Sequence, residues 1–408
     1  MAIIIPFKAL RPEVQYAKQV ASPPYDVLSS KEAKIIAQGN PASFLHITKS
    51  EIDLPEDVDI HSDLVYAKAK ENLNAFIQRK ILFTETKECF YIYQLIMDNV
   101  QQTGLVCCSS VDDYENGIIK KHEFTRPEKE ADRINHMKAI HAQTGNVFLA
   151  YKNVDEVDTI INAWKTGRSP IYDFVADDKI QHSIWLINDE KIINKIKMLF
   201  EKKVEFTYIA DGHHRAASAA KVRGSGEGLN NAANYFLTTL FPANQLRILD
   251  YNRVIKDLNN YSEEDFLKTL EMDFNVSKSN EPVKPSNVGI FGMYLNKQWY
   301  KLDLKSSEKI DEDPVSTLDI SKLDSRILKP ILGIADQRTD KRIDFIGGIR
   351  GLEALEKRVD SGEMAVAFTI FPVTINQLFE VADSGNVMPP KSTWFEPKLR
   401  DGLLTHLI

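Results

Sequence analysis

Residues 204–222 read VEFTYIADGHHRAASAAKV, and this stretch guides the interpretation of the rest of the sequence. The apolar run from Val204 to Ala210 is typical of a buried strand, and the alanine-rich run after Arg215 is typical of a helix. Gly212 stands between them and can adopt backbone angles that other residues avoid. The stretch therefore predicts a strand, a tight turn and a helix that begins at the turn.

The first turn of this helix carries His213, His214 and Arg215, and we expect His214 and Arg215 to be exposed there. A helix N-terminus offers free N–H groups and the positive end of the helix dipole, which together favour an anion. Cations at that end are unfavourable unless a negative group offsets them. The cluster therefore predicts a phosphate-binding site at Asp211, Gly212 and the three basic residues.

Two other interpretations of this turn remain open. Asp211 is a common type of helix-capping residue, and the two histidines would then simply face the solvent. The second is a zinc site, although adjacent histidines diverge by about 100° around a helix and suit one metal poorly. A third ligand at a recognisable spacing is missing from the sequence.

The composition excludes several classes of protein. The 408 residues carry a formal net charge of −7, whereas nucleic-acid phosphates are held by dense Lys and Arg surfaces, so we expect no nucleic-acid partner. No apolar run approaches the roughly 18 residues that cross a bilayer, and the N-terminus lacks the regions of a signal peptide. The 3 cysteines are too few for a disulfide framework. We therefore expect a cytoplasmic enzyme without a membrane partner, and the sequence does not indicate an oligomeric state.

Strand and helix patterns alternate along the chain, and no internal repeat is present. Besides a first strand near the N-terminus, the patterns predict helices at 62–80, 127–144, 189–201 and 374–383, and strands at 90–97, 104–110, 147–151, 204–210, 288–295 and 299–304. This mixture predicts an α/β to α+β fold with a mixed sheet. We place the domain boundary near residue 255, between a core at 1–255 and an additional C-terminal α/β region at 256–408.

Several motifs resemble those of one protein family. They are PPYDV at 23–27, HEFTRP at 122–127, ADGHHR at 210–215 and MPPKSTWFEPK at 388–398. Their order over nearly the whole chain identifies it as a member of the bacterial and archaeal family known as domain of unknown function 1015. The Asp-Gly-His-His-Arg turn is also similar to the phosphate-binding turn of the ParB/sulfiredoxin superfamily, which includes kinases of free L-serine.

This resemblance implies a ParB/sulfiredoxin-like phosphate-binding core that transfers a phosphoryl group from diphosphate, or from a nucleotide, to the hydroxyl of L-serine. Mg²⁺ is the implied cofactor, since transfer from diphosphate normally needs a metal to offset charge. The common nucleotide loop and the protein-kinase signatures are absent from the sequence. Because the superfamily also contains DNA-binding and reductase members, a non-catalytic nucleotide- or nucleic-acid-binding regulator and a phosphate-ester hydrolase are alternatives.

The HEFTRP motif and the helix after it supply further candidates. Because of the resemblance, we expect Arg126, Lys129 and Arg133 to contact the anion. Lys129 and Arg133 are four residues apart and therefore share one helix face. The alternative is a solvated helix laced with ion pairs. Glu123 is expected to be either a general base or a magnesium ligand.

Asp26 follows the two prolines of the first motif. It either begins a turn, as Asp often does near Pro, or accepts the proton of the substrate hydroxyl. The resemblance ranks Asp26 slightly above Glu123 as the base. His214 is the third residue for which we expect a catalytic role.

The C-terminal motif predicts a basic loop that Pro389-Pro390 stiffens. The functional interpretation is a lid whose lysine contacts the donor phosphates, and the candidate phosphate-binding residues in it are Lys391, Ser392, Thr393 and Lys398. A solvated basic loop is the alternative. Arg253, which follows a predicted strand, is a further candidate for phosphate binding, with a structural salt bridge as its alternative role.

Overall fold

The computed structural model describes residues 1–226, 231–305 and 313–408, and its chain forms two compact units. Unit 1 comprises Met1–Leu246 and Pro397–Ile408, and unit 2 comprises Arg247–Glu396. The expected boundary near residue 255 differs from this division. Residues 247–255 belong to unit 2, and the chain returns to unit 1 at Pro397.

Backbone pairing explains this division. Strand β14 (Tyr251–Ile255) pairs with two strands of the unit 2 sheet, so residues just before 255 cannot belong to the first unit. Strand β21 (His406–Leu407) instead pairs with β7 (Ala142–Gln143) of unit 1.

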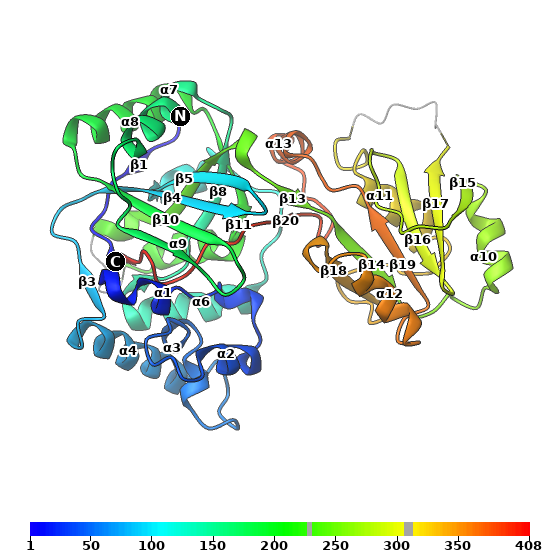
Figure 1. The fold of residues 1–408 in the computed structure, drawn as a ribbon, viewed down its shortest axis with the longest axis horizontal. Helices are drawn as coiled ribbons and strands as arrows, with labels where there is room; N and C mark the ends of the chain where they lie inside the picture. The colour runs from blue at the N-terminus through cyan, green and yellow to red at the C-terminus, as the bar shows by residue number, and fades with distance from the viewer. Residues whose placement is uncertain (227–230, 306–312) are drawn as a thin grey trace. The chain divides into compact units, whose positions relative to one another are not determined.

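Unit 1 is built on a nine-stranded sheet, shown in Figure 1. Its strands are β1 (Ile4–Ile5), β4 (Phe90–Met97), β5 (Val100–Ser110), β6 (Ile119–Lys120), β8 (Val147–Tyr151), β9 (Tyr172–Val175), β10 (Gln181–Ile187), β11 (Thr207–Asp211) and β12 (Tyr235–Pro242). The order is β6-β11-β8-β12-β5-β4-β10-β9, and β1 pairs with β5. β11 runs parallel to β6, and β12 runs parallel to β8, while the other pairs are antiparallel. The predicted α/β to α+β class with a mixed sheet is confirmed.

The helices of unit 1 are α1 (Ala17–Val20), α2 (Ser30–Ala37), α3 (Leu45–Thr48), α4 (Asp63–Gln78), α5 (Val111–Glu115), α6 (Pro127–Ile140), α7 (Asp155–Lys165), α8 (Glu190–Lys203) and α9 (His213–Ser225). In Figure 1, α7 and α8 lie on one side of the sheet and α4 lies on the other. Ile160 of α7 and Ile196 of α8 join the sheet residues in one buried cluster. Leu73 and Phe76 of α4 form a separate cluster with Phe44. Smaller buried clusters, one around Met137 and Val222 and one around Ala33 and Leu45, add to these two within the unit.

Short elements complete unit 1. They are the strand pair β2 (Leu10–Pro12) and β3 (Leu82–Thr84) and the 3₁₀ turns η1 (Val14–Tyr16), η2 (Tyr25–Val27), η3 (Ser50–Asp53), η4 (Asn231–Asn234) and η5 (Ala243–Gln245). Within the described residues, no helix is both long enough and apolar enough to span a bilayer.

Two predicted boundaries in unit 1 need correction. The connection expected at 98–102 is a two-residue turn, because Asp98 and Asn99 both adopt positive φ (50° and 64°), and β5 therefore begins at Val100 rather than at residue 104. The helix expected to reach Thr144 ends at Ile140, because His141 adopts the left-handed conformation (φ 52°, ψ 41°). The chain then enters β7, whose pairing with β21 would be lost if the helix continued.

Unit 2 contains a six-stranded antiparallel sheet with the order β15-β17-β16-β19-β14-β18. Besides β14, its elements are β13 (Ile248–Leu249), α10 (Glu263–Leu270), β15 (Phe274–Ser279), β16 (Ile290–Leu295), β17 (Gln298–Leu304), α11 (Asp319–Leu323), the π-helical turn η6 (Asp324–Leu328), β18 (Ile343–Gly347), η7 (Gly348–Arg350), α12 (Glu353–Asp360), β19 (Val366–Ile370), α13 (Ile375–Asp383) and β20 (Trp394–Phe395). The turn expected at Asn296-Lys297 joins β16 to β17. α12 packs Leu355 and Val359 against Tyr294 and Trp299 of these two strands.

Candidate functional site

The strand, turn and helix predicted at 204–222 are β11, Gly212 and α9, but β11 begins at Thr207 rather than at Val204, because Val204 ends α8 as its C-cap residue. Gly212 adopts φ 96° and ψ 30°, a left-handed conformation that favours glycine, and a Cβ atom there would lie 3.4 Å from the Val147 Cα. Small side chains let α9 pack closely on α6, and Ala216 and Ala219 are buried. The side chain of Ser218 donates to the Glu130 carbonyl of α6 at 3.2 Å. The sequence therefore fixes both the turn and the helix that follows it.

Asp211 does not occupy the N-cap position of α9, which is taken by Gly212. Instead, its Oδ2 accepts from the Lys398 Nζ at 2.9 Å. Burial alone would raise the pKa of Asp211, but Lys398 and Arg215 hold it well below its usual value. Asp211 is therefore an ionised group whose role is to fix Lys398 beside the turn.

Arg215 is buried, contrary to the exposed position that we expected, and its side chain is only 9% exposed. Nη2 donates to both carboxylate oxygens of Asp26, at 2.9 and 2.8 Å, and Nη1 donates to the Asn146 carbonyl at 2.6 Å. Burial alone would lower the pKa of Arg215, but the carboxylates of Asp26 and Asp211 raise it well above its usual value. This fixed cation orients the Asp26 side chain, which remains 30% exposed.

His213 is also buried, and its ring packs edge-on against His122, with the ring centroids 4.6 Å apart. Its Nε2 accepts from the His122 backbone N–H at 3.4 Å, and its Nδ1 lies 3.8 Å from the Glu123 Oε2. Burial and the neighbouring His122 lower the pKa of His213 well below its usual value. His213 is therefore neutral and does not supply the positive charge expected from the sequence.

His214 is half-buried and joins the starts of two helices. Its Nε2 accepts from the backbone N–H of Arg126, the residue that precedes α6, at 3.1 Å. Since Nε2 accepts, the proton of the neutral ring lies on Nδ1 and is available to a ligand. Burial lowers the pKa of His214, and the positive charges of Lys129 and Arg126 lower it further. The positive ends of α6 and α9 therefore meet at His214.

The three basic residues of the α6 region occupy different environments. Arg126 and Lys129 are exposed near His214. Arg133 is largely buried: it donates to the Asp132 Oδ2 at 2.9 and 2.6 Å, and its guanidinium lies 3.9 Å from the centre of the Tyr25 ring. The structure therefore brings Arg126 and Lys129 to the turn, whereas Arg133 forms part of a wall behind Tyr25.

Tyr25 was not predicted from the sequence as a site residue, but it separates two arginines. Its ring contacts Arg133, and the Arg215 guanidinium lies 5.5 Å from the ring centre. A small cavity of about 30 Å³ is lined by these three side chains together with Thr144 and Gly145. The cavity lies next to Asp26, since Asp26 follows Tyr25 in the chain and binds Arg215.

Asp401 is the second residue that the sequence did not predict. It is buried, its backbone pairs with Ser22, and its Oδ2 accepts from the Tyr25 backbone N–H at 3.4 Å. Burial raises the pKa of Asp401 to about 7 although Arg215 acts to lower it, and the neighbouring Asp26 adds to the rise. The Asp401-Gly402 dipeptide, typical of a turn, was the available signal, but it lies beyond the family motif at 388–398.

The residues predicted to form the C-terminal lid lie in different units. Lys398 belongs to unit 1 and pairs with Asp211, whereas Lys391, Ser392, Thr393 and Arg253 belong to unit 2. Arg253 is fully buried and donates from Nη2 to the carbonyls of Pro390 and Lys391, both at 3.1 Å.

Further contacts in unit 2 hold the 389–393 segment. Burial lowers the pKa of Arg253 to about 9. The Ser392 hydroxyl donates to the Pro389 carbonyl at 2.6 Å, and the Lys391 Nζ lies 5.6 Å from the centre of the Tyr251 ring. Arg253 and Ser392 therefore shape the loop from within unit 2.

The side chains of this site could hold a magnesium ion only if a bound ligand supplied most of the oxygen atoms around the metal. Among residues 1–226, 231–305 and 313–408, no group of three or more His, Cys, Asp or Glu side chains is arranged to hold a metal. Mg²⁺ in phosphate-handling sites uses one or two carboxylates together with substrate phosphates and water. Glu123, half-exposed beside His213, matches that limited requirement.

A search for family membership gave a match over residues 4–321 to the family described as protein of unknown function DUF1015. The chain belongs to this family, as the sequence motifs predicted. A comparison with curated proteins found no match.

A comparison with solved structures gave matches of low identity. A free serine kinase in complex with AMP is 13% identical with a TM-score of 0.36, and the alignment covers 72% of this chain and 86% of that chain. A conserved hypothetical protein from Pyrococcus furiosus is 13% identical with a TM-score of 0.34, covering 74% and 95%. C-terminally truncated SbnI from Staphylococcus aureus is 10% identical with a TM-score of 0.39, covering 74% and 87%. At these TM-scores the likenesses do not identify a shared activity.

Proposed function

We propose that this protein is a small-molecule kinase that transfers a phosphoryl group from diphosphate, or from a nucleotide, to the hydroxyl of free L-serine. The observation that carries this proposal is the meeting of two helix N-termini at His214, where its Nε2 accepts from the Arg126 N–H at 3.1 Å. Free amides and the positive ends of both dipoles favour a phosphate there. Exposed Arg126 and Lys129 add positive charge at the same place.

The donor phosphates would lie against the first turn of α9. The His214 Nδ1–H and the free amides at the start of the helix donate to the phosphate oxygens, and Lys398, held by Asp211, lies beside them. Phosphoryl transfer depends mainly on positioning and on stabilising charge, so neutral histidines that donate hydrogen bonds suit this task. A bound Mg²⁺, with Glu123 as its protein ligand, would neutralise charge on the donor.

Asp26 would act on the acceptor. Arg215 holds its carboxylate in one orientation, and the remaining exposed part faces a ligand. The carboxylate accepts the proton of the serine hydroxyl, and the serine oxygen bonds to the transferred phosphorus as the bond from phosphorus to the donor's leaving oxygen breaks. This assigns the donor to the first turn of α9 and the acceptor to Asp26.

The test is an end-point assay with L-serine, Mg²⁺ and one of diphosphate, ATP or ADP, analysed by phosphorus NMR. We expect O-phosphoserine with one of these donors, and parallel reactions without L-serine measure hydrolysis of the donor alone. A phosphate-ester hydrolase would release phosphate at the same rate with and without L-serine. Absence of O-phosphoserine with all three donors would refute the proposed kinase activity.

A further inference from the structure

A second cavity in unit 1 lies beside the candidate site and is lined mostly by polar and charged side chains. It has a volume of about 50 Å³, and the residues that matter here are Lys49, Glu51, Asp132, Arg133 and His136. A single water needs roughly 10–15 Å³ of such space, so this cavity holds several waters or a small polar molecule. Tyr25 and Arg133 line both this cavity and the smaller one next to Arg215. The two cavities therefore share a wall.

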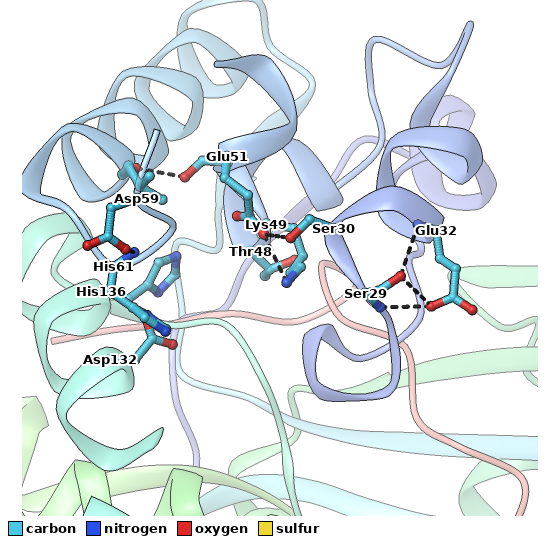
Figure 2. A network of polar contacts seen from close by, with 12 residues as sticks. Ser29, Ser30, Glu32, Thr48, Lys49, Glu51, Asp59, His61, Asp132 and His136 are labelled. Atoms are coloured by element: carbon cyan, nitrogen blue, oxygen red, sulfur yellow. Dashed lines mark hydrogen bonds and ion pairs between the residues drawn. The ribbon is translucent and has the colours of Figure 1, made fainter. Parts of the chain in front are cut away.

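The charges around the cavity form two pairs of opposite sign. Lys49 Nζ lies 2.9 Å from Glu51 Oε1, and these side chains are only 14% and 10% exposed. Arg133 and Asp132 form the second pair at 2.6 Å. Figure 2 shows the Lys49–Glu51 pair and Asp132 within one polar network. A ligand that contacts one member of a pair draws that member away from its partner. A ligand with a single charge would leave the partner without an opposite charge, whereas a zwitterion supplies a charge of opposite sign to both members.

His136 adds an acceptor to the lining. Its Nε2 lies 2.9 Å from the Ile47 carbonyl oxygen, so Nε2 carries the proton and Nδ1 is the acceptor of the neutral ring. Burial, together with the charge of Arg133, lowers the pKa of His136 to about 4, although the Ile47 hydrogen bond and the charges of Asp132 and Glu51 act in the opposite direction. A neutral acceptor flanked by two carboxylates suits an ammonium group.

Asp132 and Glu51 are both fixed by hydrogen bonds from other segments. Asp132 Oδ1 accepts from the Tyr66 hydroxyl at 3.0 Å and lies 3.1 Å from the His61 Nδ1. Glu51 Oε1 accepts from the Ser30 hydroxyl at 2.7 Å. These contacts hold the carboxylates in place before a ligand arrives, which lowers the cost of ordering the site on binding.

We propose that this cavity binds the zwitterionic head of a free α-amino acid. Its carboxylate contacts Lys49 and Arg133, and its ammonium group contacts Glu51, Asp132 and His136. This assignment rests on the proposed kinase function for one feature: the bound amino acid is the acceptor whose hydroxyl gives its proton to Asp26. The cavity thus accounts for the selection of a free amino acid as the acceptor.

The test compares Lys49→Met and Glu51→Gln with the control Lys34→Met in the full-length protein. Lys34 lies on α2 and pairs with Glu56 at the surface, so Lys34→Met loses the same charge outside the cavity. Binding of L-serine is measured by calorimetry without a phosphoryl donor, and KM and kcat are measured by the phosphorus assay. Ethanolamine, which lacks the carboxylate, and 3-hydroxypropionate, which lacks the ammonium group, serve as competing ligands.

We expect Lys49→Met to weaken L-serine binding and raise its KM about 10- to 100-fold, with little change in kcat or in ethanolamine binding. Glu51→Gln should weaken L-serine and ethanolamine but not 3-hydroxypropionate. A purely structural defect would weaken all three ligands together, so that pattern in both variants would overturn the proposal. Lys34→Met should match the wild type throughout.

The two proposals can fail separately. If no donor yields O-phosphoserine but L-serine binds and Lys49→Met weakens that binding, the kinase proposal fails and the amino-acid site stands. If O-phosphoserine forms and both cavity variants behave like Lys34→Met, the kinase stands and the amino-acid site is refuted. Failure of the wild type to bind L-serine even at high millimolar concentration would also refute the amino-acid site.

Discussion

One nitrogen of Arg215, Nη2, donates to both carboxylate oxygens of Asp26, at 2.9 and 2.8 Å. The pair joins α9 to the 3₁₀ turn η2, two elements that are far apart in the sequence. Arg215 is buried and Asp26 is partly exposed, so the pair has one structural member and one member that can act on a ligand.

Arg215→Ala should therefore destabilise the fold as well as abolish turnover. We expect the free energy of unfolding to fall by about 2–4 kcal/mol, because the variant loses three charged hydrogen bonds in a buried place. Arg223→Ala is the matched control on the same helix, since Arg223 pairs with Asp112 and Glu115 nearer the surface and should cost at most about 1 kcal/mol. Equal urea midpoints for the two variants would contradict a structural role for Arg215.

His214→Ala should separate activity from stability. His214 is half-buried, and its proposed role is to donate to the phosphate ligand. We therefore expect turnover to drop about 10²–10³-fold while the free energy of unfolding changes by less than about 1 kcal/mol. The control is His46→Ala, which removes a histidine of α3 that is bonded to Asp53 of η3, and it should leave turnover unchanged. Wild-type turnover in His214→Ala would show that phosphate binds elsewhere.

Asp26 and Glu123 should respond differently to magnesium. Asp26→Asn removes the proposed base, so kcat should fall about 10²–10⁴-fold with the same dependence on Mg²⁺. Glu123→Gln removes the proposed metal ligand, so the Mg²⁺ concentration for half-maximal rate should rise and excess metal should restore part of the activity. Near-wild-type rates for both variants at ordinary Mg²⁺ would mean that other carboxylates perform these roles.

Asp401 should make stability depend on pH. Its pKa is raised to about 7 in the folded state, against about 3.9 in an unfolded chain, so the folded protein loses stability as pH rises between these values. Asp401→Asn cannot ionise, so it should be more stable than the wild type above pH 7, and the difference should shrink steadily toward pH 4. Thermal unfolding across this range measures the effect, and a difference that does not vary with pH would rule it out.

The 389–393 loop should open when Arg253 is replaced. Arg253→Met removes the donors to the Pro390 and Lys391 carbonyls, so tryptic cleavage after Lys391 should become faster. If the loop closes over a phosphate donor, diphosphate or ATP should slow the cleavage in the wild type. If neither diphosphate nor ATP changes the rate of cleavage, the loop does not act as a lid over the donor and has only a structural role in unit 2.

Local patterns were sufficient for much of the fold. The strand ranges 90–97 and 147–151 match β4 and β8, because alternating or continuous apolar residues report burial directly. The end of α6 could not be predicted in this way. His141 turns the chain because β7 must meet β21, and that partner lies far away in the sequence.

The candidate site was predictable as a motif but not as a set of charges. Adjacent His213 and His214 look alike in the sequence, yet packing against His122 buries one and the start of α6 orients the other. Asp401 has no motif around it, and its role depends on burial beside Arg215. Tertiary contacts set the charge state of each of these groups, and these contacts cannot be deduced from a local sequence pattern.

The return of the chain to unit 1 at Pro397 has a consequence for biosynthesis. Domains generally fold as units while the chain is being made. Here Lys398, the partner of Asp211, and Asp401, beside Arg215, are translated only after all of residues 247–396. A nascent chain that stops within unit 2 would carry the His-His-Arg turn without Lys398, the lysine that pairs with Asp211. Premature release would therefore yield fragments in which Asp211 and Arg215 lack charged neighbours that the complete chain supplies.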